Sequence, residues 1–216
     1  MGEQAVLDKQ THPGDEDSTK RRQIIGGARD VFLAQGFDAA SMNDIARAAG
    51  VSKGTLYVYF DNKEQLFEAI VEEECDAQAE GIFDLDANDH DAEAALKRLG
   101  VAYVKFLCRP EKASAVRTVI AIADRMPEIG RKFYEAGPAV GIGRLAAYLS
   151  AQTAAGVLAV GDCEVAAAQF MESCHAMLFK PIVFNFAPAP SPEQIERVVG
   201  IAVSTFMAAY HVPGRS

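Results

Sequence analysis

The fold is decided by residues 41–57, which read SMNDIARAAGVSKGTLY. A serine opens each half of this stretch, at Ser41 and Ser52, and serine is a preferred N-cap of helices. Between the halves, Gly50 supplies the left-handed residue that a tight turn needs. The stretch therefore predicts two short helices joined by a turn, a helix-turn-helix. The apolar face of the first helix consists of Met42, Ile45, Ala46 and Ala49.

The second helix is expected to present its N-terminal end to DNA bases, as recognition helices do. Leu56 and Phe60 stand four residues apart and are expected to point inward, which leaves small and polar side chains outside. Ser41, at another helix N-terminus, offers backbone N–H groups and a hydroxyl to a phosphate. The candidate DNA contacts are Ser41, Ser52, Lys53, Gly54, Thr55, Tyr57, Tyr59 and Lys63.

The sequence pattern divides the chain into three segments. Residues 1–17 are polar and acidic, and we expect them to form a disordered tail. Residues 18–63 are expected to form the DNA-binding domain, with a first helix that begins at Ser18 and stops at Gly36. Residues 64–216 are expected to form a larger helical domain.

The C-terminal part reads as helices separated by proline and glycine. One strong start signal is Ser191, which Pro192 and Gln194 follow. The predicted fold class is all-α, with a three-helix N-terminal domain, a larger bundle and about nine to ten helices. The later helices are expected near residues 91–108, 112–124, 127–135, 163–180 and 192–210. One more is expected after Gly137-Pro138, and it runs to about residue 154.

Ordered motifs run through residues 28–70 at fixed spacing. They are Ala28-Arg29-Asp30-Val31-Phe32, Gly36-Phe37, Ser41-Met42-Asn43-Asp44-Ile45-Ala46, Ala49-Gly50-Val51-Ser52-Lys53-Gly54-Thr55-Leu56-Tyr57, Tyr59-Phe60 and Lys63-Glu64-Gln65-Leu66. This stretch resembles the TetR family of bacterial regulators. The resemblance implies a homodimer, usually a repressor, that leaves a two-fold-symmetric DNA operator when a small-molecule inducer enters the C-terminal domain.

The resemblance also implies functional positions. Tyr59 stands where many family members have histidine and Asp61 where many have proline, so no operator sequence carries over. Residues 125–138, RMPEIGRKFYEAGP, resemble the AefR-type subgroup, which does not fix a ligand. The DNA contacts implied on matching positions are Ser41, Lys53, Thr55, Tyr57, Tyr59 and Lys63.

Eight aromatic, methionine or histidine side chains are candidates for lining a ligand pocket. Side chains of these types at helical spacing more often pack in a core, and that alternative stays open. His175 stands out because a polar tip on an apolar helix needs a partner. The eight residues are Tyr103, Phe106, Met126, Phe133, Tyr134, Met171, His175 and Phe179.

The last two long helices are expected to form a homodimer interface. Two such helices per chain pair naturally with their copies into a four-helix arrangement. A two-fold dimer would read half-sites about 34 Å apart. The apolar faces are marked by Val165, Ala168, Gln169, Glu172, Ala176 and Phe179 on the first helix, and by Ile195, Val199, Ala202, Val203 and Phe206 on the second.

The net charge of −9 does not exclude nucleic acid, because the charge is unevenly distributed. It is −4 over residues 1–17, +1 over residues 18–70 and −6 over residues 71–216. The segment with the helix-turn-helix is thus the one that is not acidic. A small positive face on an acidic body can still bind phosphate.

Two other function classes, an enzyme and a protein-binding module, fit the sequence less well than DNA binding does. The sequence lacks the motifs of phosphate loops, serine hydrolases, zinc proteases and cysteine–histidine zinc sites, so we expect no enzyme, no cofactor and no metal. A helix-turn-helix that binds a protein would be expected to expose larger apolar anchors than residues 52–55.

Cysteine usage and hydropathy indicate where in the cell the protein is expected. The four cysteines, Cys75, Cys108, Cys163 and Cys174, are expected to be buried and reduced. The sequence shows neither a signal-peptide core nor the run of about 18 apolar residues that a membrane helix needs. We therefore expect a soluble protein of the cytoplasm with no membrane contact.

Overall fold

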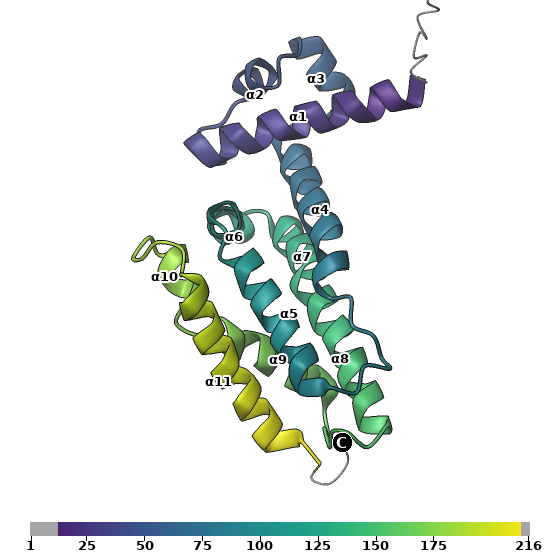
Figure 1. The fold of residues 1–216 in the computed structure, drawn as a ribbon. Coiled ribbons are helices and arrows are strands. Elements are labelled where there is room, and N and C mark those ends of the chain that lie inside the picture. The colour runs from purple at the N-terminus through teal and green to yellow at the C-terminus, as the bar shows by residue number, and fades with distance from the viewer. Residues whose placement is uncertain (1–12, 213–216) are drawn as a thin grey trace, which may run out of the picture. The chain divides into compact units, whose positions relative to one another are not determined.

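The computed structural model describes residues 13–212, with the backbone alone for residues 13–16 and 74–80. Within this range every regular element is a helix, as Figure 1 shows, and the predicted all-α class is confirmed. No helix of the described residues is both long and apolar enough to cross a membrane. The eleven helices of this range are α1 (Pro13–Gln35), α2 (Met42–Ala48), α3 (Lys53–Tyr59), α4 (Lys63–Ile82), α5 (Ala92–Leu107), α6 (Pro110–Ala123), α7 (Pro127–Ala136), α8 (Pro138–Ala154), α9 (Cys163–Cys174), α10 (Phe179–Val183) and α11 (Pro192–Tyr210).

The chain divides into two compact units, the first ending at Ile70 and the second beginning at Val71. This division falls inside α4. The boundary expected from the sequence, between Lys63 and Glu64, lies in the first turn of the same helix.

The start of α1 corrects the expected tail of residues 1–17. Residues 1–12 lie outside the described part of the chain, but α1 begins at Pro13 and includes residues 13–17. Proline at the first helical position loses no intrahelical hydrogen bond, and acidic residues favour the positive end of a helix dipole. The acidic composition that suggested disorder therefore also suits a helix start.

Aromatic and aliphatic side chains form the core of the first unit. The rings of Phe32, Phe37 and Phe67 contact one another, with centroids 5.3 to 5.7 Å apart. Ile45 of α2 and Leu56 of α3 are fully buried. The inward positions predicted from helical spacing are thus confirmed for both short helices.

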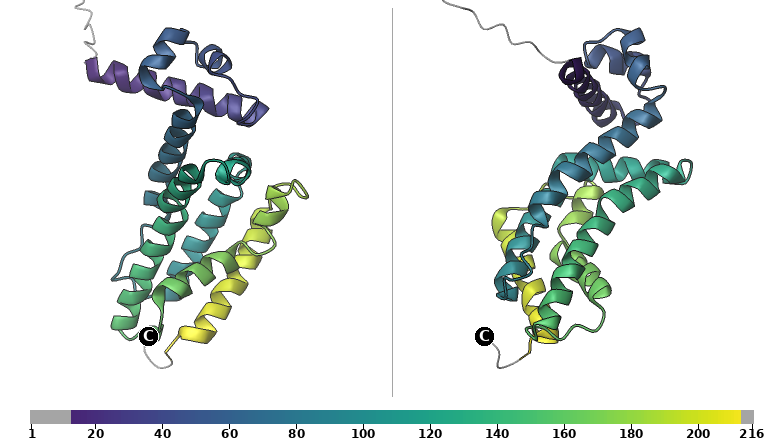
Figure 2. Two further views of the ribbon diagram at one scale, coloured as in Figure 1. Left: turned by 180° about the vertical axis from the view of Figure 1, so that it is seen from behind. Right: turned by 90° about the vertical axis from the view of Figure 1, so that its right-hand side faces the viewer.

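The core of the second unit lies among α5, α8, α9 and α11. Helix α9 packs against both α8 and α11, and α11 also packs along α5, as can be followed in Figure 2. Leu96, Leu145 and Val199 are fully buried there. The contact between α5 and α11 is close, since a Cβ atom on Gly100 would lie 2.7 Å from Val199 Cγ1.

The face of α11 that was predicted for the dimer interface is buried within the chain itself. That part of the prediction was wrong, because α5 and α9 cover this face. The other side of α11 is open, with Val198 half-buried and Ile201 exposed. The core-facing residues are Ile195, Val199, Ala202, Val203 and Phe206.

The helix predicted over residues 163–180 is two helices in the structure. Helix α9 ends at Cys174, and Met177 has a φ of 66°, a left-handed conformation that a continuing helix does not allow. Helix α10 then holds Pro181 in its first turn, where the missing N–H group is not needed. This break accounts for the one helix beyond the expected nine to ten.

Candidate nucleic-acid interface

A hydrogen-bonded cap fixes the start of α2. The Asp44 amide donates to Ser41 Oγ at 3.2 Å, and the Ser41 hydroxyl donates to Asp44 Oδ2 at 2.5 Å. The predicted N-cap is therefore confirmed. The hydroxyl of Ser41 lowers the pKa of Asp44 below its ordinary value, and the nearby Arg47 guanidinium acts in the same direction. In this arrangement the Ser41 hydroxyl is already used within the protein.

The turn between α2 and α3 is held by α1. Gly50 has a φ of 63°, the left-handed conformation predicted for it. Gln23 of α1 donates from Nε2 to the Ala49 carbonyl at 2.6 Å. Helix α1 also approaches the end of α2 closely, since a Cβ atom on Gly27 of α1 would lie 2.5 Å from the Ala49 nitrogen. These contacts fix the position at which α3 begins.

Helix α3 exposes small and polar groups at its N-terminal end. Ser52 caps the helix, since the Thr55 amide donates to Ser52 Oγ at 3.0 Å. Leu56 faces inward and is fully buried. Residues 52–54 and Tyr57 are exposed, while Thr55 is half-buried.

Two of these side chains share one outward face of α3. Lys53 Nζ lies 5.9 Å from the ring centroid of Tyr57, one helical turn further along. The Tyr57 side chain is 43% exposed. A cation and a phenol hydroxyl at this place can both reach phosphates or base edges.

Tyr59 is held by a partner from α1. Its hydroxyl donates to Asp17 Oδ1 at 2.6 Å, and this carboxylate raises the pKa of Tyr59. No pattern in the sequence could indicate this pair, because the two residues are far apart along the chain. A contact from Tyr59 to DNA would compete with Asp17 for the hydroxyl proton.

Lys63 is engaged within the protein. Its Nζ donates to the carbonyls of Phe37 at 2.8 Å, Asp38 at 3.1 Å and Ala40 at 3.3 Å. An ammonium group has three protons, so these bonds use all of them. The geometry gives Lys63 a role in fixing the loop between α1 and α2, and its contact with a DNA phosphate stays a prediction.

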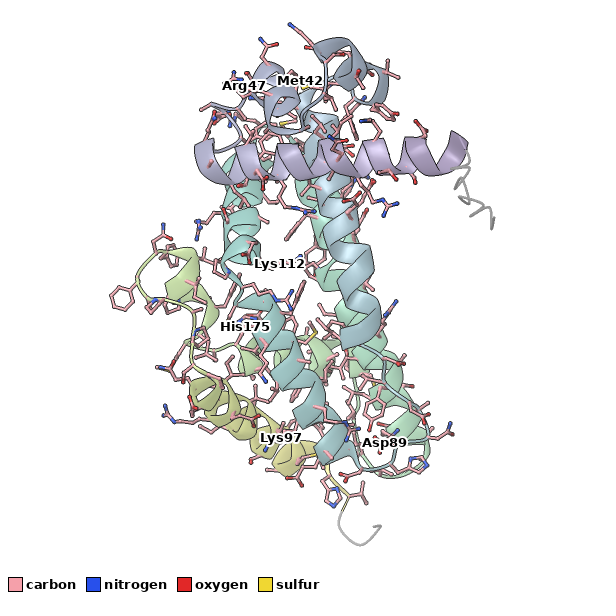
Figure 3. The ribbon with its side chains drawn as sticks, turned by 45° about the horizontal axis from the view of Figure 1, so that its top comes forward. Met42, Arg47, Asp89, Lys97, Lys112 and His175 are labelled. Carbon is pink, nitrogen blue, oxygen red and sulfur yellow. The ribbon has the colours of Figure 1, made fainter. Side chains whose placement is uncertain are left out.

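Arg47 is a cation that the predicted set of contacts lacks. Its side chain is 78% exposed and donates from Nη2 to Asp44 Oδ1 at 2.8 Å. Figure 3 labels it on α2 with Met42. The sequence signal was an arginine three residues after an aspartate, a spacing typical of an ion pair on one helix face.

Four of the eight predicted pocket residues lie together in the second unit. The ring centroids of Tyr103 and His175 are 6.0 Å apart, and those of His175 and Phe179 are 5.8 Å apart. Met171 is buried in the core against which Tyr103 and Phe179 pack. Phe83, which the sequence analysis did not single out, extends the series at 6.0 Å from Tyr103. We call Phe83, Tyr103, His175 and Phe179 the ring series.

The polar groups of the ring series are held in their neutral forms. Burial lowers the pKa of His175, although Glu172, with Oε1 at 3.5 Å from Nε2, acts in the opposite direction. Burial also raises the pKa of Tyr103, and the charge of Glu172 adds to that rise. A neutral imidazole and a neutral phenol suit an uncharged partner.

The other four predicted pocket residues are outside the core cluster and the ring contacts found among the described residues. Tyr134 is 57% exposed on α7, a position that does not line an enclosed site. Phe106 lies beneath Lys112, whose Nζ is 4.5 Å from the ring centroid. Met126 and Phe133 are half-buried. Helical spacing alone could not separate these positions from the first four.

A pocket of about 260 Å³ opens elsewhere in the second unit. Its walls come from the end of α4, the loop before α5, α5 and α8. Arg98 donates to Asp89 Oδ2 at 2.5 Å and lowers the pKa of that carboxyl, while Tyr148 donates to the Asp89 carbonyl at 2.8 Å. Asp89 is labelled in Figure 3. The sequence signal was the acidic run over residues 84–91, which the predicted pocket did not include.

The described cysteines are free thiols. Cys108 and Cys174 are buried as expected, and burial raises their pKa values to about 11 and about 12. Cys163 is half-buried, in contrast to the expectation. The side chain of Cys75 lies outside the described part.

Comparison with known families shows which family the chain belongs to. Residues 24–70 match the profile of bacterial regulatory proteins of the tetR family, and residues 94–212 match the C-terminal domain of AefR-like transcriptional repressors. The chain belongs to the TetR family of transcriptional regulators. Its family and relatives are regulators of transcription and not enzymes.

Individual relatives agree with the family assignment. The repressor AcnR of Corynebacterium glutamicum is 34% identical over 67 residues, which span 31% of this chain and 36% of that protein. A solved structure from Mesorhizobium loti MAFF303099, described as a TetR-family transcriptional regulator, has a TM-score of 0.84 and 30% identity over 90% of this chain and 98% of that chain. The flavonoid-responsive regulator FrrA has a TM-score of 0.76 and 34% identity over 91% of this chain and 100% of that chain.

Proposed function

We propose that this chain is a sequence-specific DNA-binding repressor that acts as a homodimer and is released from a two-fold-symmetric operator by a small-molecule ligand. The observation that carries the proposal is the exposed N-terminal end of α3, where residues 52–54 and Tyr57 face outward and Leu56 is buried beneath. The AefR-like repressor profile and the name of AcnR support repression.

In this proposal α3 enters a major groove and its first turn meets base edges. Gly54 leaves room for the DNA, and the side chains around it are short or flexible. Lys63 acts indirectly, because it fixes the loop that leads into α2. Tyr59 contributes only where DNA outcompetes Asp17 for its hydroxyl. Ser41 would have to contact DNA through the backbone N–H groups at the start of α2, because its hydroxyl is bonded to Asp44. The proposed direct contacts are Ser41, Arg47, Ser52, Lys53, Gly54, Thr55 and Tyr57.

A second copy of the chain supplies the second recognition helix. Val165 of α9 is 50% exposed and Ile201 of α11 is 57% exposed. Ala168 and Val198, on the same two helices, are half-buried. Apolar side chains left open on two neighbouring helices are typical of an interface. The proposed dimer therefore uses the open side of α11 and not its core-facing side.

The ligand site is proposed at the ring series. Its rings offer stacking surfaces, and the neutral tips of Tyr103 and His175 can donate or accept a hydrogen bond. Such a site suits an uncharged aromatic molecule. The description of FrrA as flavonoid-responsive supports an aromatic ligand class for this chain.

Release requires only that the ligand prefers one of two conformers. A ligand that binds more tightly to a conformer with mismatched recognition helices shifts the dimer toward it, and DNA binding weakens by the same coupling free energy. No new contact between ligand and DNA is needed.

Enrichment from a random DNA pool tests the proposal. The purified chain is mixed with random duplexes, bound duplexes are sequenced over several rounds, and affinity for the enriched site is measured by fluorescence anisotropy. We expect a two-fold-symmetric site. Tyr57→Ala is expected to weaken binding by about 1–3 kcal/mol, roughly 5- to 150-fold.

Tyr134→Ala is the matched control, because it removes an exposed tyrosine from α7 in the other unit. It is expected to bind the enriched site as the wild type does. The proposal fails if no sequence is enriched and Tyr57→Ala binds DNA as tightly as the wild type. Binding to a protein partner would then be the alternative.

A further inference from the structure

The connection between α9 and α11 carries an exposed apolar surface. Met177, Phe184 and Phe186 are 87%, 77% and 85% exposed, and all three lie within ten residues. We call these three side chains the α10 patch. At about 150–250 Å² for an aromatic side chain, the patch exposes on the order of 400 Å² of apolar area. Exposed large apolar side chains that gather in one short segment of a soluble protein often mark an interaction site.

The backbone that carries the patch is held in place. Arg117 of α6 donates from Nη1 to the carbonyls of Ile182 at 3.1 Å and Val183 at 3.4 Å, at the end of α10. The Phe186 amide donates to the Pro181 carbonyl at 2.8 Å. The rings are therefore presented outward by a hydrogen-bonded turn.

Two residues of the segment that carries the patch have left-handed backbone conformations. Asn185, between the two phenylalanines, has a φ of 52°. Met177, which begins the patch, is also left-handed, a conformation that is uncommon for a methionine and ordinary for an asparagine.

The patch lies between the end of α9 and the start of α11. Helix α10 and the loop that follows it lie at the N-terminal end of α11, as Figures 1 and 2 show from three directions. Met177 comes three residues after α9, and Phe186 comes six residues before α11. A partner that lies along the whole length of α9 and α11, and so covers Val165 and Ile201, would therefore also reach the α10 patch.

We propose that the α10 patch packs against a second copy of this chain and extends the interface made by the open faces of α9 and α11. The inference rests on the proposed homodimer and names a surface that this dimer uses. In a two-fold dimer each copy presents the same surface, so two patches are covered at once.

The areas agree with this assignment. Two copies of the patch would remove on the order of 800 Å² from water, whereas stable interfaces bury about 1,200–2,000 Å² in total. The patch is thus too small to hold a dimer alone. A dimer therefore also needs the exposed apolar side chains of α9 and α11, among them Val165 and Ile201.

Sedimentation equilibrium of the full chain tests the proposal. The double variant Phe184→Ser/Phe186→Ser is compared with the wild type and with Tyr134→Ser, which replaces an exposed aromatic residue outside the patch. The dimer dissociation constant is expected to rise at least about tenfold in the double variant and to stay unchanged in the control. Far-UV circular dichroism shows that each variant is folded.

The outcomes separate the patch from the dimer itself. If the wild type is a dimer and the double variant has the same dissociation constant, the proposal that the patch belongs to the interface is overturned. The proposed function is then unaffected. A wild type that stays monomeric at all concentrations overturns both.

A cross-linking measurement tests the same contact while an aromatic side chain is kept at position 186. The photoreactive residue p-benzoylphenylalanine is placed at Phe186 in one variant and at Tyr134 in another, and the irradiated dimer is analysed by denaturing gel and mass spectrometry. A cross-link between two copies is expected for position 186 and not for position 134. A fully dimeric sample without a cross-link from position 186 would mean that something other than a second copy covers the patch.

Discussion

The close approach of α1 and α2 makes Gly27→Ala a decisive substitution for the DNA-binding unit. A Cβ atom on Gly27 would lie 2.5 Å from the Ala49 nitrogen and 2.7 Å from both Ala49 Cα and Cβ. These atoms are backbone or attached directly to it, so no flexible side chain can move aside. Ordinary van der Waals contact begins at 3.4 Å, and the two helices would have to separate by about 1 Å.

The expected cost follows from that clash. Overpacking of a well-packed core typically costs about 1–3 kcal/mol, against which the better helix propensity of alanine returns about 0.5–1 kcal/mol. The neighbouring Gly26 is the matched control, because nothing lies within 4 Å of a Cβ atom built there. Gly26→Ala should therefore stabilise the same helix by about 0.5–1 kcal/mol.

Unfolding in urea, followed by far-UV circular dichroism, measures both variants. We expect the midpoint of the first unit to fall for Gly27→Ala and to rise slightly for Gly26→Ala. Operator affinity should fall for Gly27→Ala as well, because the same contact fixes where α3 begins. Equal midpoints for the two alanine variants would refute the argument that this helix contact is fully packed.

Three further predictions concern single side chains. Lys63→Met should lower the free energy of unfolding and leave the salt dependence of DNA binding unchanged. Lys53→Met should instead reduce the slope of log K against log salt by about 1. Equal slopes for both variants would contradict this. Because burial lowers the pKa of His175 in the folded chain, the unfolded chain takes up the proton first, and the free energy of unfolding should fall as the pH drops below the ordinary value of 6.5. His175→Phe should lose that part of the pH dependence in urea titrations, and a pH profile equal to that of the wild type would count against it. Ser191→Ala removes the capping box of α11 and should cost about 1 kcal/mol in the same assay, while Ser204→Ala, at an exposed position of that helix, should cost much less.

The helix-turn-helix could be predicted from the sequence because its signals are local. Ser41 and Ser52 cap helices that begin one residue later, and Gly50 is left-handed where the turn demands it. Each of these features depends on neighbours within four residues. The inward positions Ile45 and Leu56 follow from helical spacing alone.

The features that the sequence missed depend on contacts between distant segments. Lys63 was expected to face DNA, but its three carbonyl partners lie more than twenty residues earlier in the chain. Apolar spacing on α11 showed that a face was buried, yet it could not show whether α5 or another chain covers it. The break at Met177 was missed for a different reason, because no glycine marks the left-handed residue.

The most direct test of the account compares three duplexes at one salt concentration: the enriched site, the same site with one half scrambled, and a random duplex. The account predicts two chains per enriched site and an affinity at least about 10³-fold higher than for the random duplex, most of which is lost when one half is scrambled. Equal affinities for all three duplexes would mean that the chain binds DNA through charge alone, and the claim that two α3 helices read its sequence would be contradicted.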